Sequence, residues 1–177
     1  MSERRPVEAA VLAPVYRDAE GRLRLVLILR GPRGVHGSQI ALPGGRREPG
    51  DRDLLATALR EAEEEIGVDP TGVELLCPLP IVETATTGYT IAPFLGRLRD
   101  RPVAWRPQES EVAAVLDVLV DELARPGVHG EEVQRFPGWP EPRRMPYYQV
   151  GPYRLWGATY RIVHPLLPRL LAPEWRI

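Results

Sequence analysis

The sequence of 177 residues contains one cysteine, Cys77, and this scarcity excludes two classes of small protein. A disulfide-stabilised fold needs pairs of cysteines, and a C-x-x-C metal knuckle needs at least two. Long apolar runs are also missing: none approaches the roughly 20 residues that span a bilayer. The N-terminal residues MSERRPVE lack the apolar core of a signal peptide. We therefore expect a cytoplasmic protein without a membrane partner.

Lysine and asparagine are absent, so all 23 basic residues are arginine. Together with 20 prolines, this composition fits either heat adaptation or the codon bias of a GC-rich genome, and both explanations stay open. The chemical consequence is that any phosphate must be bound by arginine or by backbone N–H groups. A formal net charge of -1 excludes a globally basic nucleic-acid-binding protein, so we expect no nucleic-acid partner.

Hydrophobic residues make up 44% of the chain, which is enough to form a buried core. The length suits one domain over residues 1–177. The pattern of a helix is clearest over residues 53–67, where Asp53 is a suitable N-cap and Gly67 a suitable C-cap.

Most of the other periodic segments have the character of strands. Residues 6–17 and 22–30 predict a hairpin around the turn between them. Further strands are predicted over residues 73–83, 89–98 and 111–120, and a second hairpin over 147–150 and 153–156. Residues 157–171 predict a C-terminal helix that its two prolines kink or segment, and the dense Pro, Gly and charge of residues 126–146 predict a long surface loop. The mixture of strands and helices indicates an α+β fold.

An acidic face on the first helix is the main chemical feature. Glu61, Glu64 and Glu65 are spaced i, i+3 and i+4, so they project from the same side of that helix. Acidic helix faces are usually only solvated, but here the pair Gly44-Gly45 lies just upstream and lets the backbone approach a ligand closely. Carboxylate oxygens at this density suit a hard cation, Mg2+ or Mn2+, which bridges the protein to substrate phosphates.

These residues resemble the signature of the Nudix hydrolases, G-x5-E-x7-R-E-U-x-E-E-x-G-U, in which U is a bulky aliphatic residue. The second half of the signature is similar to the run from Arg60 to Val68, with Ala62 where bulk is preferred. In the first half, Asp51 stands where glutamate is expected after Gly45, and eight residues rather than seven separate it from Arg60. The resemblance therefore assigns no role to Asp51.

A narrower resemblance is to the coenzyme A pyrophosphatase branch of the same family. Upstream of the glutamates, that branch has the pattern L-L-T-x-R-S-x-x-L-R-x-H-x-G-Q-V-x-F-P-G-G. The similar positions here are residues 27–30, His36, Gln39 and residues 42–45, with one residue fewer in the intervening loop. Downstream, segments of the branch that read S-G-x-x-V-x-P, D-E-V-A-E-V and I-W-G-A-T are similar to residues 87–93, 110–115 and 155–159.

The signature is called the Nudix box, and the helix over residues 53–67 that carries it is the box helix. The resemblance implies the Nudix fold, an α/β/α sandwich with a mixed sheet between the box helix and a C-terminal helix. It also implies that a divalent cation and an activated water hydrolyse a small-molecule nucleoside diphosphate. Glu61 and Glu65 are the expected primary metal ligands, with Glu64 as the third. The expected general base is Glu64 or Glu111, and Arg60 is expected to orient a carboxylate.

Coenzyme A or a derivative is the substrate that the narrower resemblance implies, with 3′,5′-ADP and 4′-phosphopantetheine as products. Two alternatives are ADP-ribose or another nucleotide-sugar diphosphate, and a non-hydrolysing nucleotide sensor, which the intact box disfavours. The oligomeric state stays open between a monomer and a homodimer. We expect Glu65→Gln to abolish turnover without unfolding, on the premise that the acidic face is exposed. The expected substrate-binding residues are Arg30, Arg33, His36, Gln39, Gly44 and Gly45.

Overall fold

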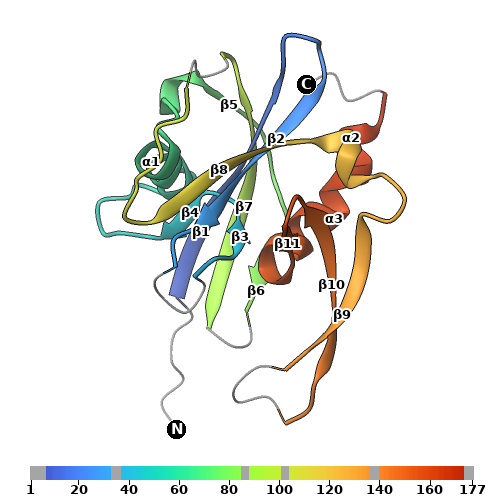
Figure 1. Ribbon diagram of the computed structural model, residues 1–177. Helices are drawn as coiled ribbons and strands as arrows, with labels where there is room; N and C mark the ends of the chain where they lie inside the picture. The colour runs from blue at the N-terminus through green and yellow to red at the C-terminus, as the bar shows by residue number, and fades with distance from the viewer. Residues whose placement is uncertain (1–6, 33–36, 85–87, 101–103, 136–139, 174–177) are drawn as a thin grey trace, which may run out of the picture.

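A mixed β-sheet forms the centre of the computed structural model, which describes residues 7–32, 37–84, 88–100, 104–135 and 140–173 (Figure 1). Strands β1 (Val7–Arg17) and β7 (Tyr89–Leu98) lie parallel at its middle. Strand β2 (Leu23–Arg30) pairs antiparallel with β1, and strand β5 (Val73–Pro78) pairs antiparallel with β7. The remaining strands of this sheet are β3 (Ile40–Ala41) and β8 (Val112–Leu119) on β2, β4 (Gly44–Arg46) on β1, and β6 (Val82–Glu83) on β7.

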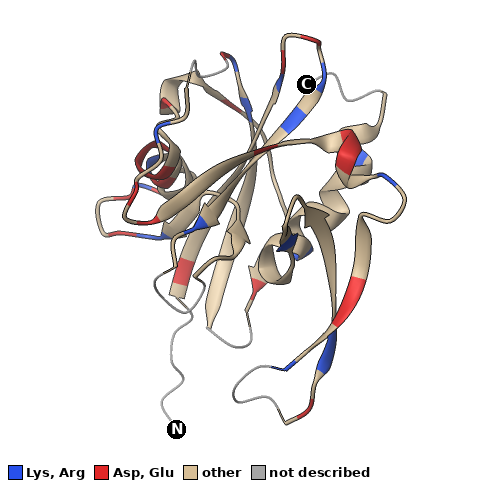
Figure 2. Cartoon of the chain, viewed as in Figure 1, with Lys and Arg blue, Asp and Glu red and all other residues tan. Residues whose placement is uncertain are grey.

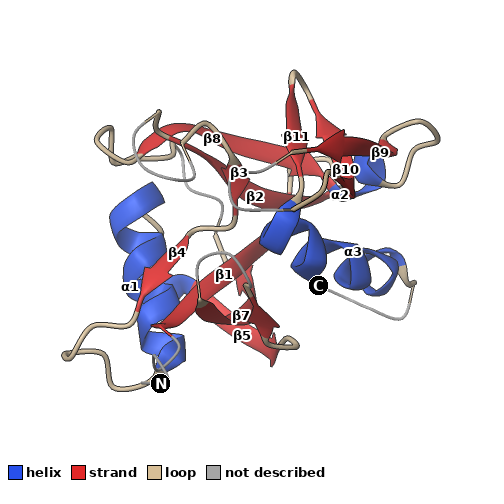
Figure 3. Cartoon of the chain, turned by 90° about the horizontal axis from the view of Figure 1, so that it is seen from below, coloured by secondary structure: helices blue, strands red, loops and turns tan. Residues whose placement is uncertain are grey.

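Two helices cover opposite faces of this sheet, as the sandwich prediction requires. Helix α1 (Leu54–Ile66) lies on one side of β1 and β7, and helix α3 (Gly157–Leu171) lies on the other (Figure 3). Strand β2 shows why both faces must be apolar. Leu25, Leu27 and Leu29 join the core on the α3 side, whereas Val26 and Ile28 join the core on the α1 side. A central strand buried on both faces has a continuous apolar run instead of strict alternation.

Helix α1 begins and ends where the sequence predicts. The Asp53 carboxylate accepts a hydrogen bond of 2.8 Å from the Ala56 N–H, which satisfies one of the free donors at the helix start. Gly67 ends the helix in the left-handed conformation, with φ of 73°. Strand β8 leads directly into the short helix α2 (Val120–Leu123). Among the described residues, no helix is both long and apolar enough to cross a bilayer.

Helix α3 corrects one prediction, because it runs without interruption through Pro165 and Pro168 and is not segmented by them. Both prolines are exposed. On the solvent side of a helix, water can satisfy the carbonyl groups that a proline leaves without an N–H partner. The apolar stripe of α3, which includes Val163 and Leu166, faces the sheet and holds the helix in place.

The prediction of a surface loop over residues 126–146 is wrong, because ten of its 17 described residues belong to a second, three-stranded sheet. This sheet contains β9 (His129–Gln134), β10 (Arg143–Val150) and β11 (Tyr153–Leu155), all antiparallel. The hairpin of β10 and β11 was predicted, but β10 begins four residues earlier than Tyr147. Both β9 and the start of β10 are rich in charge, and their strand character comes from pairing with each other.

One predicted strand is divided, and one segment without a predicted structure forms a strand. The predicted strand over residues 73–83 is divided into β5 and β6, with Pro80 in the break, where it has no N–H to donate to a ladder. The glycine pair after Pro43 is not a free loop. It forms β4, because Gly44 and Gly45 pair with Val11 and Ala10 of β1.

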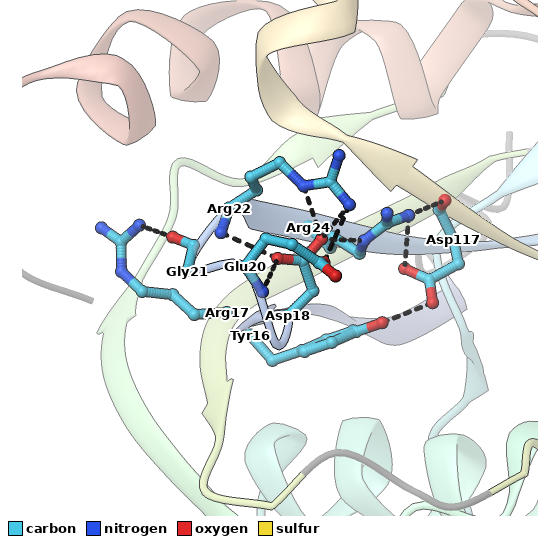
Figure 4. A network of polar contacts seen from close by, with 8 residues as sticks. All are labelled: Tyr16, Arg17, Asp18, Glu20, Gly21, Arg22, Arg24 and Asp117. Carbon is cyan, nitrogen blue, oxygen red and sulfur yellow. Dashed lines mark hydrogen bonds and ion pairs between the residues drawn. The ribbon is translucent and has the colours of Figure 1, made fainter.

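An ionic network around the buried side chain of Asp18 lies at the turn of the β1–β2 hairpin and connects this turn to β8 (Figure 4). Asp18 in the β1–β2 turn is 3% exposed at its side chain and accepts hydrogen bonds from Arg22 and Arg24 at 3.0 and 2.9 Å. Arg24 also donates to the carbonyl of Asp117 in β8 at 3.1 Å, and Tyr16 donates to the Asp117 carboxylate. The network therefore holds the turn, β2 and β8 together.

Candidate active site

Helix α1 is rich in acidic residues (Figure 2), and the three glutamates of its acidic face lie at different depths. Glu65 is 2% exposed and Glu61 is 14% exposed at its side chain, whereas the side chain of Glu64 is 52% exposed. The premise that this face is exposed is therefore wrong for Glu65. The three carboxylates therefore differ in exposure: that of Glu65 lies between helix and sheet, and that of Glu64 lies in solvent.

The glycine pair allows β4 to lie directly against these glutamates. The N–H of Gly44 donates a hydrogen bond of 2.8 Å to Oε2 of Glu65. A Cβ atom on Gly45 would overlap the carboxylate of Glu61, and one on Gly44, whose φ is 156°, would overlap the backbone of β1. The close approach predicted at this pair is thus made to the carboxylates, which it helps to place.

Burial and mutual repulsion change the protonation equilibria of the inner carboxylates. Burial raises the pKa of Glu65 to about 7, the Gly44 N–H and Arg30 oppose this rise, and Glu61 and Glu111 add to it. Burial likewise raises the pKa of Glu61 above its ordinary value. A cation beside two such carboxylates would favour their ionised forms, because it offsets both the desolvation and the repulsion.

Arg60 connects this cluster to the loop before the helix. Its Nε and Nη2 atoms donate to both carboxylate oxygens of Asp51, at 3.0 and 3.1 Å. Its Nη1 atom lies 3.0 Å from Glu61 and 3.1 Å from Glu64, so the predicted contact with a carboxylate one turn away is present. Thr57 also donates to Asp51, at 2.9 Å. Asp51 is therefore the residue that the sequence analysis missed, and the signal for it was an acid at the glutamate position of the box.

The end of β2 and the residues just before β3 and β8 are joined by backbone hydrogen bonds. The N–H of Arg30 donates to the carbonyl of Gln39 at 3.0 Å, and the N–H of Gly31 donates to the carbonyl of Glu111 at 2.6 Å. Burial is the main cause of the raised pKa of Glu65; the charge of Arg30 acts to lower this pKa and that of Glu111 to raise it. The other predicted substrate-binding residues, Arg33 and His36, lie outside the described residues.

The donor set suits a hard cation that completes its coordination with substrate. In the described part of the chain, no three His, Cys, Asp or Glu side chains are gathered closely enough to form a ready-made cage. Mg2+ is usually held by one or two carboxylates, with waters and substrate phosphates as its other ligands. Glu61 and Glu65 offer such a pair, and burial, which raises the pKa of each, is a cost to the ionised forms that a bound cation would offset.

A cleft of about 490 Å3 adjoins the loop between β4 and α1. Arg46, which lines it, also accepts a hydrogen bond of 3.1 Å from Arg60 at its backbone carbonyl. The cleft therefore borders the Arg60–Asp51 pair, but none of the three glutamates lines it. The full lining is Val7, Glu8, Arg46, Arg47, Glu48, Pro49 and Asp51.

Comparison with known proteins agrees with this geometry. The family model of the NUDIX domain matches residues 6–155. The chain belongs to the Nudix family. It is 35% identical over 161 residues to NudL of Citrobacter koseri, a Nudix hydrolase described as uncharacterised, and the match covers 90% of this chain and 80% of NudL. The NudL protein of Cronobacter sakazakii is 36% identical with the same coverage.

Solved Nudix structures share the fold at lower identity. A Nudix hydrolase of M. smegmatis, RenU, is 23% identical with a TM-score of 0.57 over 69% of this chain and 78% of its own. The Ap4A hydrolase of C. elegans in a binary complex is 19% identical with a TM-score of 0.55 over 66% and 82%. The NUDIX domain of Shewanella oneidensis NrtR, complexed with ADP ribose, is 18% identical with a TM-score of 0.54 over 70% and 79%. The Nudix fold predicted from the box is thus confirmed.

Proposed function

We propose that this Nudix protein hydrolyses the diphosphate linkage of coenzyme A or its derivatives and releases 3′,5′-ADP and 4′-phosphopantetheine. The observation that carries the hydrolytic part is the pair of buried Glu65 and partly buried Glu61, which contact Gly44 and Arg60 respectively. Membership of the Nudix family supports nucleoside diphosphate chemistry in general. The proposal that coenzyme A is the substrate rests on where the segments that resemble the coenzyme A pyrophosphatase signature lie in the structure.

Mg2+ or Mn2+ bound at Glu61 and Glu65 would neutralise the phosphate oxygens and activate a water as nucleophile. Arg60 keeps Glu61 and Glu64 from turning away from the ligand, because one guanidinium group contacts both. Two carboxylates remain candidates for the base that takes the proton from water. Glu64 is near the solvent and is bound to Arg60, whereas Glu111 directly precedes β8 and its backbone carbonyl accepts from the Gly31 N–H after β2.

The coenzyme A signature is next to the metal-binding carboxylates in space. Its first part ends at Arg30, its second part starts at Gln39, and a backbone hydrogen bond joins these two residues. Its final glycine pair begins at Gly44, which is hydrogen-bonded to Glu65. A substrate whose diphosphate lies at the glutamates would therefore extend toward Arg30, whose positive charge suits the additional 3′-phosphate of coenzyme A.

A substrate panel with Mn2+ tests the proposal. Coenzyme A, dephospho-coenzyme A, ADP-ribose, NADH and diadenosine polyphosphates would be compared by kcat/KM at equal metal concentration. We expect coenzyme A to be the best substrate. Preference for ADP-ribose would overturn the coenzyme A proposal, and absence of turnover with every member would overturn the hydrolase proposal. The ADP-ribose complex of the related NrtR domain makes ADP-ribose the second candidate.

Arg30→Gln tests the recognition of the 3′-phosphate. Losing this charge should raise KM for coenzyme A by roughly 10- to 150-fold, with little effect on dephospho-coenzyme A, since a charge-assisted contact with phosphate contributes about 1.5–3 kcal/mol. Arg125→Gln is the matched control, because its side chain is 65% exposed and pairs only with Glu122 among the ion pairs described. An equal loss with both substrates would assign Arg30 to the shared diphosphate instead.

Glu64→Gln and Glu111→Gln separate the two candidate bases. Replacing the base should lower kcat about 100-fold or more and remove the acidic limb of the pH–rate profile. Replacing the other residue should leave that limb in place. If both variants keep the limb, neither residue is the base.

A further inference from the structure

The outer edge of β9 has no strand partner among the described residues. The second sheet has the order β11-β10-β9, so β10 covers only one edge of β9. The β9–β10 hairpin also extends away from the main sheet (Figure 1). Val133 is 59% exposed on this strand, and Glu131 and Arg135 are exposed on either side of it. An open strand edge is a template for pairing with another chain.

One hydrogen bond shows which backbone groups of β9 face outward. The N–H of Gln149 donates to the carbonyl of Val128 at 2.8 Å, in the register that β9 and β10 share. Hydrogen-bonded pairs of an antiparallel ladder recur at every second residue. Even-numbered residues of β9 therefore direct their backbone groups to β10. The odd-numbered residues of β9, which are His129, Glu131 and Val133, direct theirs to the open edge, and Arg135 follows the strand in the same phase.

The charges select one register for pairing between two copies. In such a pair, the outward backbone groups of one copy must lie opposite the outward backbone groups of the other. Because these groups belong to every second residue, the two-fold axis has to pass through a residue and not between two residues. An axis at Glu131 or at Glu132 would place that glutamate opposite its own copy, which like-charge repulsion disfavours. An axis at Gln134 would oppose Val133 to Arg135. An axis at Gly130 would oppose Glu131 to His129, whose ring is already hydrogen-bonded to Tyr160, and would leave Val133 opposite a residue outside β9. Only an axis at Val133 opposes valine to valine and Glu131 to Arg135, and symmetry makes the ion pair twice.

We propose that two copies of this chain associate through the β9 edge, antiparallel, about a two-fold axis at Val133. Each opposed pair of outward residues exchanges two N–H···O bonds, and the two sheets become one continuous sheet. Arg144 of the same chain lies 3.6 Å from Glu131 and holds that carboxylate on the strand surface beside Val133. The interface is small, so the dimer forms at high protein concentration and dissociates on dilution.

Sedimentation equilibrium over a range of protein concentrations tests this interface. The wild-type mass should rise from 19.8 kDa toward twice that value as concentration increases. Arg135→Glu and Glu131→Arg should each lose the dimer, because each places like charges opposite one another twice. An equimolar mixture of the two variants should regain it, because Glu131 of one then opposes Arg135 of the other and the two introduced residues oppose each other.

Two further variants separate the interface from a folding defect. Val133→Pro removes an outward N–H but no bond to β10, so it should lose the dimer and keep the circular dichroism spectrum of the wild type. Arg125→Glu makes the same charge change away from this edge and should keep the dimer. A wild type that stays monomeric at every concentration would overturn the proposal. So would a dimer that survives Val133→Pro, or a mixture of folded variants that stays monomeric.

Discussion

Arg60 is the residue on which the geometry of the site depends most. Its guanidinium group contacts Asp51, Glu61 and Glu64 at distances of 3.0 to 3.1 Å. The side chain of Asp51 is 6% exposed, and its contacts with Arg60 hold the pKa of this carboxyl well below its usual range. Because Asp51 occupies one side of the planar guanidinium, it sets the direction in which Arg60 presents its remaining N–H groups.

Asp51→Asn should therefore impair catalysis without touching the glutamates. We expect kcat/KM to fall about tenfold and the free energy of unfolding to fall by about 1–2 kcal/mol, since a hydrogen bond to a charged group is lost. Steady-state kinetics and urea unfolding measure the two effects. Glu48→Gln is the control in the same loop, because the contact of Glu48 with Asp51 uses its backbone N–H. Unchanged kinetics in Asp51→Asn would show that Arg60 keeps its position without this partner.

At the scale of elements, the contact of β4 with α1 places the inner carboxylates. Strand β4 contains two glycines, pairs with β1 on one edge and presents its backbone to the helix. A side chain at Gly45 would meet Glu61 of the helix, and one at Gly44 would meet the backbone of β1. The site thus depends on how closely two short elements approach, which is a property of neither one alone.

Gly45→Ala tests this approach. The added methyl group would meet the flexible end of Glu61, so the carboxylate should move while the fold is kept. We expect kcat to fall at least tenfold and the free energy of unfolding to change by less than about 1 kcal/mol. Gly50→Ala is the matched control, because nothing lies within 4 Å of a Cβ atom there. Equal activity of the two variants would contradict the close contact.

The β1–β2 hairpin and β8 depend on the Asp18 network in a way that pH reveals. Burial acts to raise the pKa of Asp18, but hydrogen bonds from Arg24 and Arg22 outweigh it and hold the pKa well below the ordinary value. This contribution to stability is present above the ordinary aspartate pKa and is lost as pH falls through the lower, folded-state value.

Asp18→Asn should accordingly lower Tm by several degrees at pH 7, because two arginines lose their charged partner. The difference from wild type should shrink when Tm is measured at increasingly acidic pH. Glu20→Gln, in the same turn, should change Tm little, because Glu20 is exposed and contacts only Arg22 among the ion pairs described. A constant difference between Asp18→Asn and wild type at all pH values would contradict the role of the charge.

At the scale of the whole molecule, the burial of Glu65 lowers the stability of the fold when this carboxylate is ionised, which is the form that the proposed metal binding requires. Its pKa is about 7 in the folded protein, against an ordinary value of 4.5. The folded state therefore binds more protons between these pH values, and the free energy of unfolding decreases as pH rises from the lower value to the higher one. The loss is on the order of 1–3 kcal/mol.

Glu65→Gln should remove that part of the pH dependence, because glutamine cannot ionise but can still accept from the Gly44 N–H. In metal-free buffer at pH 8 the variant should be as stable as the wild type or more stable, and Mn2+-dependent turnover should be lost. Urea unfolding at pH 5 and pH 8, together with the substrate assay, measures both effects. Parallel stability curves for variant and wild type would contradict the raised pKa, and retained turnover would remove Glu65 from the proposed ligand set.

Local features of the chain could be predicted from the sequence. The span of α1, its caps at Asp53 and Gly67, the first hairpin and the order of residues in the box depend on periodicity and turn chemistry within a few residues. The family was inferred from the resemblance of the same short run to the Nudix signature, and the i, i+4 spacing of Glu61 and Glu65 places these two carboxylates on one face of the helix. These features needed no knowledge of what packs against them.

The tertiary structure decided how deeply each carboxylate is buried and which residues contact one another. Helical spacing places Glu64 and Glu65 side by side, but only the approach of β4 buries one and leaves the other in solvent. Asp51 acquires its partner because the loop before α1 folds back onto Arg60, and β9 becomes a strand because β10 lies beside it. Burial and distance between residues far apart in the chain arise from packing, which no local pattern contains.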